Sequence, residues 1–102
     1  MEINIIEGPD TVINITGRID TVNAPVFEKA ITPVLAGDMK NVVLDCTTLD
    51  YISSSGLHLF LVMQKAANAK QGKLSLKGMK AEIKEIFDMT GFSSMFSFIH
   101  DE

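Results

Sequence analysis

The sequence has few of the residues that build disulfides and nucleic-acid surfaces. Cys46 is the only cysteine among the 102 residues, so no disulfide can form within the chain. A reduced, cytoplasmic setting is therefore the simplest expectation. Arg18 is the only arginine among nine basic residues, which are scattered and outnumbered by 13 acids, for a net charge of −4. This balance argues against nucleic acid as a partner, because phosphate binding needs clustered lysine and arginine.

Long apolar runs are also missing. No segment approaches the roughly 18 consecutive apolar residues of a membrane-spanning helix, so we expect no direct membrane insertion. The first residues, Met1 to Asn4, have no basic region followed by an apolar one. They therefore do not predict a secretory signal.

The residues that usually carry catalysis are sparse. The glycines form no phosphate-cradling or dinucleotide pattern. Two histidines, His58 and His100, and one cysteine are too few for a predicted zinc site or a thiol active site. Asp45 and Asp50 could form an acid–base pair, but acids in so short a connection commonly serve solubility and capping. We therefore expect a protein that is not an enzyme and that has neither a cofactor nor a bound metal.

The hydrophobic content and its periodicity favour one small globular α/β domain over residues 1–102. Hydrophobic residues make up 46% of the chain, which predicts a folded core rather than disorder. The order of the patterns predicts a mixed sheet of four to five strands with helices packed on it. The expected elements are a hairpin over 3–16, strands over 42–46 and 74–76, an edge strand or packed tail over 96–99, and helices over 23–36, 56–70 and 79–90.

The most informative segment lies in the middle of the chain. The apolar strand ends at Asp45-Cys46-Thr47-Thr48, and a second apolar step leads to Ser53-Ser54-Ser55-Gly56 and then to a helical pattern. Ser55 is therefore predicted to lie in a tight turn at a helix N-terminus, with its hydroxyl facing water. Free N–H groups and the positive helix end both favour a phosphate there. The alternative is that the serines serve only as capping residues.

The helix that follows carries a second signal. Its apolar residues Leu59, Phe60, Val62, Met63 and Ala66 share one side. Leu57 and Leu61 fall among polar residues on the other side, beside His58. They predict an apolar contact for a partner next to Ser55. The alternative is that neighbouring elements cover most of this helix.

Three sequence segments together resemble the STAS domain family, and most closely its single-domain bacterial members, the anti-sigma factor antagonists. The most specific segment joins Leu44-Asp45-Cys46-Thr47 to Tyr51-Ile52-Ser53-Ser54-Ser55-Gly56-Leu57. Gly17-Arg18-Ile19-Asp20-Thr21 with Asn23 is similar to a second signature. The segment from Ile83 to Phe92 is similar to the closing helix and turn. The resemblance spans essentially the whole chain.

The resemblance implies the site and the partners. It makes Ser55, the residue before the glycine, the phosphoacceptor, while Ser53 stands where the family commonly has an aspartate. Residues expected near the phosphorylation site are Ser53, Ser54, Gly56, Asp20, Thr21 and Asn23, and those expected to bind the partner are Leu57, Leu61 and His58. The implied partner is an anti-sigma factor with a histidine-kinase-like ATPase fold, and a serine phosphatase would reverse the modification.

Two other functions remain open. One is a STAS scaffold subunit of a lipid-transport or stress-signalling complex, in which Ser55 is never phosphorylated. The other is a small-ligand-binding STAS domain, for which the sequence offers no phosphate-cradling loop.

Overall fold

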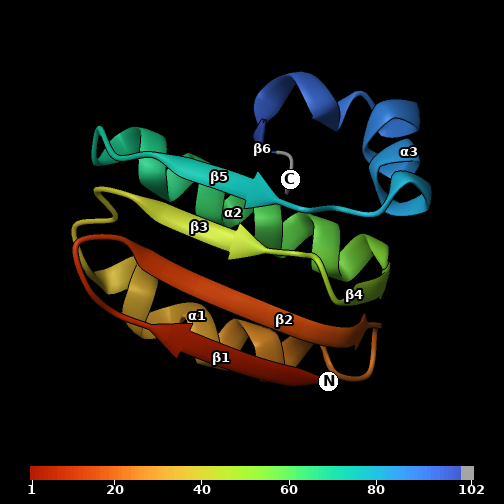
Figure 1. Cartoon of the computed structure of the whole chain (residues 1–102), viewed down its shortest axis with the longest axis horizontal. Helices are drawn as coiled ribbons and strands as arrows, with labels where there is room; N and C mark the ends of the chain where they lie inside the picture. Colours follow the sequence, from red (N-terminus) through yellow and green to blue (C-terminus); the bar gives the residue numbers. More distant parts are fainter. Residues whose placement is uncertain (100–102) are drawn as a thin grey trace.

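A computed structural model describes residues 1–99, and His100 lies outside this part of the chain. Helices separate single strands and pairs of consecutive strands along the chain (Figure 1). In chain order they are β1 (Glu2–Ile6), β2 (Thr11–Ile19), α1 (Ala24–Ala36), β3 (Val42–Asp45), β4 (Leu49–Ile52), α2 (Ser54–Ala69), β5 (Leu74–Lys77), α3 (Ala81–Thr90), a 3₁₀ turn (Phe92–Met95) and β6 (Ser97–Ile99).

The strands form one mixed sheet in the order β1-β2-β3-β5-β6, with β4 paired to β2. β1 and β2 form the antiparallel hairpin that the sequence predicts, with Ile3 opposite Ile15 and Ile5 opposite Ile13. The other pairings are all parallel, because a helix crosses over between most of these strands. β6 pairs with β5, so the predicted edge strand at the end of the chain is confirmed.

The sheet has six strands rather than the predicted four or five, because β4 was not foreseen. The hairpin was predicted to end at residue 16, yet Gly17 to Ile19 belong to β2. The pairing of β2 shifts register between Gly17 and Arg18, where Gly17 has a φ of +97°. This irregularity lets one long strand pair with β3 over its first half and with β4 over its second.

The core lies between the sheet and its helices. Figure 1 shows α1 and α2 behind the same face of the sheet and α3 at one end of it. Ile13, Ile15 and Leu44 are fully buried on the covered face. A chain of aromatic contacts links the helices, with ring centroids 5.8 Å apart for Phe27 and Phe60 and 6.1 Å apart for Phe60 and Phe87.

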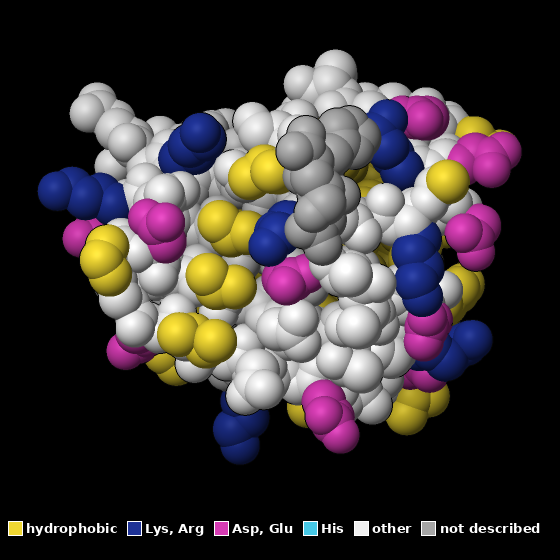
Figure 2. Space-filling view, in the orientation of Figure 1, with side chains coloured by type: hydrophobic (Ala, Val, Ile, Leu, Met, Phe, Trp, Pro, Cys, Tyr) yellow, Lys and Arg dark blue, Asp and Glu magenta, His cyan; other side chains and the backbone are white. Residues whose placement is uncertain are grey.

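The opposite face of the sheet has no helix over it in the described residues, and Figure 2 shows apolar side chains gathered there. The strand register places Ile6, Val12 and Val43 side by side across this face. Ile6 is 63% exposed. Among the helices of residues 1–99, none combines the length and the apolar character that a membrane crossing requires.

Candidate functional site

The three serines before α2 occupy three different environments. Ser53 is the N-cap, and its Oγ accepts a hydrogen bond from the N–H of Gly56 at 3.3 Å. Ser53 is buried, Ser54 is exposed and Ser55 is half-buried. The helix was predicted to begin near Gly56 but begins two residues earlier, at Ser54, because Ser53 caps it. Ser55 therefore lies within the first turn of α2.

Gly56 is buried where α2 meets the ends of two strands. A Cβ added there would lie 2.7 Å from Ile52 Cγ1 and 2.8 Å from Ile19 Cγ2. The backbone N–H of Ser53 also donates to the carbonyl oxygen of Ile19 at 2.8 Å. The first turn of α2 is thus fixed against the carboxyl ends of β2 and β4, which is where α/β sheets commonly bind ligands.

The loop between β2 and α1 is held by its own side chains. Asp20 Oδ1 accepts from the N–H groups of Val22 and Asn23 at 3.0 and 2.9 Å. Asn23 Oδ1 accepts from the N–H of Asp20 at 2.8 Å, and Asn23 Nδ2 donates to the carbonyl of Arg18 at 2.7 Å. Asn23 stands at the N-cap position of α1, as expected, but its side chain makes no capping bond because it closes this loop instead.

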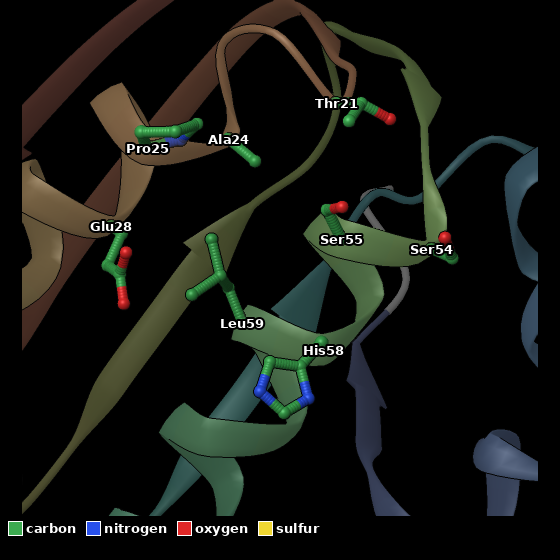
Figure 3. Close-up of a pocket in the computed structure, with 8 residues that line it drawn as sticks. All are labelled: Thr21, Ala24, Pro25, Glu28, Ser54, Ser55, His58 and Leu59. Carbon is green, nitrogen blue, oxygen red and sulfur yellow. The ribbon is translucent and has the colours of Figure 1, made fainter.

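The loop and the first turn of α2 form the two walls of an open groove of about 450 Å³ (Figure 3). The α1 side supplies Thr21, Ala24, Pro25 and Glu28, and the α2 side supplies Ser54, Ser55, His58 and Leu59. The lining residues repeat every three or four positions on each wall, which is the spacing of neighbouring residues on one helix face. The structure therefore brings together Thr21, Ser54, Ser55 and His58 of the predicted site.

The other predicted site residues lie beside the groove or beneath it. Asp20 and Asn23 order its loop, and Ser53 and Gly56 anchor the first turn of α2. The expectation that Leu57 is a surface residue was wrong. Leu57 is only 6% exposed, because its side of α2 is covered by the domain. Leu61 is half-buried and lies outside the core cluster.

The structure adds apolar surface that the sequence reasoning missed. Val22 is 88% exposed and Val26 is 59% exposed, and both adjoin groove residues along the chain. Val22 precedes the N-cap, where an apolar residue often packs back onto its helix. Its high exposure shows that it does not do so here. The sequence does contain a signal for this exposed apolar residue, because Val22 stands between the polar residues Thr21 and Asn23 in the turn before a helix.

Charged residues near the groove are few. Glu28 is the one acid among the lining residues, and His58 is the one imidazole. On neighbouring strands, the Arg18 guanidinium lies 4.6 Å from the centre of the Tyr51 ring. Lys80 forms a surface ion pair with Asp50.

Asp45 and Asp50 have different partners, since Asp50 pairs with Lys80 and Asp45 is bonded by Thr47. Burial raises the pKa of Asp45, but hydrogen bonds from the Thr47 hydroxyl at 2.6 Å and N–H at 3.1 Å, helped by Asn14 and Lys77, outweigh burial and lower it overall. Among the described residues, no group of three or more histidine, cysteine or acidic side chains could hold a metal ion.

The fold and the groove together define a small α/β domain with hydroxyl groups at the carboxyl edge of a mixed sheet. Residues 1–102 match the STAS domain. The chain belongs to the STAS domain family.

Curated relatives carry the names of anti-sigma factor antagonists. BtrV of Bordetella bronchiseptica, named an anti-sigma factor antagonist, is 36% identical over 80 residues, which cover 78% of this chain and 69% of BtrV. The anti-sigma-B factor antagonist of Staphylococcus aureus is 25% identical over 83 residues, covering 81% of this chain and 77% of that protein.

Solved structures share the fold. The anti-sigma factor antagonist SpoIIAA of Bacillus, in its unphosphorylated form, has a TM-score of 0.83 at 16% identity and covers 99% of this chain and 89% of SpoIIAA. The phosphorylated form of SpoIIAA superposes with a TM-score of 0.75. Sequence identities this low support a shared fold and no shared function.

Proposed function

We propose that this chain is an anti-sigma factor antagonist that works as a binding switch. In its unphosphorylated form it binds a kinase-type anti-sigma factor, an ATPase with a histidine-kinase-like fold, and so frees a sigma factor. That partner transfers the phosphoryl group of ATP to the Ser55 hydroxyl, and a serine phosphatase removes it. The switch operates in the cytoplasm, and the chain needs no cofactor of its own.

The observation that carries the proposal is the place of Ser55 in an open groove at the N-terminus of α2. A hydroxyl there is within reach of another protein, whereas the Ser53 hydroxyl is buried and used for capping. The positive end of α2 tolerates an added phosphate in the free protein. The names of BtrV and the S. aureus relative support the choice of partner.

The switch follows from charge and desolvation. A phosphate adds about −1.5 to −2 charge and three acceptor oxygens. In a closely packed interface the same group must lose its water, and it repels nearby acids such as Glu28. Each ~1.4 kcal/mol of this penalty lowers affinity tenfold. Phosphorylation can thus release the partner while the domain stays folded.

The proposed binding surface combines the groove with its apolar neighbours. Val22 and Val26 extend the α1 wall, while Leu61 extends the α2 wall beyond His58. Leu57 is excluded from this surface by its burial. The tight hydrogen-bonded loop of Asp20 and Asn23 holds the tip of the α1 wall in one conformation before binding, which reduces the entropy lost on association.

The decisive experiment is phosphorylation by a cognate kinase-type anti-sigma factor with ATP, followed by mass spectrometry. We expect phosphate on Ser55, none in Ser55→Ala, and normal incorporation in the matched control Ser54→Ala. Ser55→Ala should still bind the partner, and Ser55→Asp should bind more weakly. Phosphate on Ser54, or equal affinity of the partner for both forms, would reject the switch and favour a scaffold subunit that is never phosphorylated.

A further inference from the structure

His58 stands out because it shares a groove wall with Ser55. It lies three residues after Ser55 on α2, and its side chain is exposed. Residues three apart on a helix have Cβ atoms ~5–6 Å apart. Figure 3 draws the Ser55 hydroxyl and the His58 ring pointing apart, so a phosphate on Ser55 comes within reach of the imidazole when the two side chains rotate toward each other. Figure 3 shows His58 one turn below Ser55, on the same wall of the groove.

Two other basic groups near this end of the sheet have contacts of their own. Arg18 lies over the Tyr51 ring, and Lys80 pairs with Asp50. The groove lining itself contains neither lysine nor arginine. Among the residues that line the groove, His58 is therefore the one basic side chain.

The acidic side chains around the groove repel a phosphate, whereas His58 attracts it. Glu28 lies on the α1 wall, facing the α2 wall that carries Ser55 and His58. The Asp20 carboxylate is occupied by the N–H groups of Val22 and Asn23. Repulsion from Glu28 thus favours a phosphate that stays close to α2, where His58 and the helix end attract it.

We propose that His58 holds the phosphate of phosphorylated Ser55 in the groove by a charge-assisted hydrogen bond from its imidazole. The inference rests on the proposed function only in that Ser55 carries a phosphate. Held in this way, the phosphate stays on the surface that the partner would cover, and it is shielded from a phosphatase. His58 then sets how long the modified state lasts.

The test uses protein with phosphoserine built in at position 55 during translation, so that no kinase is needed. The ³¹P signal of the phosphate is followed against pH. A nearby positive charge favours the second ionisation of a phosphate, which ordinarily occurs near pH 6. His58→Gln should raise the ³¹P midpoint by at least about half a pH unit, because a unit charge even ~6 Å away in water has this effect and a hydrogen-bonded imidazole lies closer.

Three further variants distinguish an effect of His58 on the phosphate from an effect of the overall charge of the domain. His58→Arg, which keeps a positive charge at every pH of the titration, should hold the midpoint at or below that of the natural sequence. Lys65→Gln removes a cation from an exposed position further along α2 and should leave the midpoint unchanged. Glu28→Gln removes the facing anion and should lower the midpoint.

Equal midpoints for the natural sequence and His58→Gln would overturn the proposal, as would equal shifts in His58→Gln and Lys65→Gln. Either result would leave the proposed function intact, because partner binding and phosphorylation by the kinase are measured separately. Conversely, failure of every kinase to modify Ser55 would reject the switch without changing the ³¹P titration of the installed phosphoserine.

Discussion

At the scale of single residues, the serine run shows how similar side chains acquire different tasks. Ser53 caps α2 from a buried position, and Ser55 reaches the groove from the first turn. An aspartate in place of Ser53 would also cap the helix, since both residue types are preferred there. The chain therefore retains the cap although it lacks the aspartate that the family commonly has.

Gly56 is the residue on which the position of Ser55 depends most directly. We expect Gly56→Ala to lower the free energy of unfolding, because the new Cβ would collide with Ile52 and Ile19, which are both buried in the core. Overpacking typically costs ~1–3 kcal/mol, which outweighs the ~1 kcal/mol that alanine gains over glycine in a helix. Urea unfolding measures the difference.

Gly8→Ala is the matched control, because the nearest atom to its added Cβ is Asp10 O at 3.7 Å. It should change stability little. A Gly56→Ala protein as stable as the natural one would mean that Ile19 and Ile52 shift without cost, and that glycine is not required here for packing.

At the scale of elements, α2 serves both the core and the binding surface. Leu59, Phe60 and Met63 are buried, as the helical wheel predicts. Leu57 was assigned to the surface from the same wheel, but it is buried because more of the helix circumference is covered than one apolar stripe requires. Leu61 and His58 remain on the open side, one turn apart.

The pair Leu57→Lys and Leu61→Lys tests this division of α2. Leu57→Lys should reduce stability by about 3 kcal/mol or more, since it loses a buried side chain and places a charge in the core. Leu61→Lys should nearly keep the melting temperature, while affinity for a cognate anti-sigma factor falls at least tenfold. Thermal unfolding and calorimetric titration measure the two effects.

Equal destabilisation by the two lysines would place Leu61 in the core and remove it from the binding surface. A stable Leu61→Lys protein with unchanged affinity would instead limit the partner contact to the groove and the two valines, Val22 and Val26.

At the scale of the whole molecule, Cys46 reports on the integrity of the sheet. It is fully buried just after β3, and burial, together with the nearby charge of Asp45, raises the pKa of its thiol to about 12. The reactive thiolate is therefore almost absent in the folded state at neutral pH. A structural role for this cysteine agrees with its burial.

We expect Cys46 to resist thiol reagents until the domain opens. Labelling at pH 8 should follow the rate or population of unfolding, and it should accelerate with urea in parallel with the loss of secondary structure. Denatured protein, with its one cysteine, is the control for complete labelling. Rapid labelling without denaturant would reveal a local opening at the end of β3 that leaves the rest of the domain folded.

The sequence alone determined the elements whose patterns are local. The alternation in the N-terminal hairpin and the periodicity that predicts a helix over 23–36 each follow from one stretch of chain, and both elements are confirmed. The start of α2 in the serine–glycine segment was readable to within two residues, because caps depend on neighbouring residues. The role of Ser55 as phosphoacceptor stays a prediction.

Contacts between residues that are far apart in the sequence were decided only by the tertiary structure. β4 was missed because a four-residue strand with two exposed positions has little periodicity, and its pairing with β2 depends on the register shift at Gly17. Glu28 joins the groove because β2 and β4 deliver α1 and α2 to the same edge of the sheet. Burial of Leu57 and exposure of Val22 likewise depend on distant segments, which no local pattern of the sequence records.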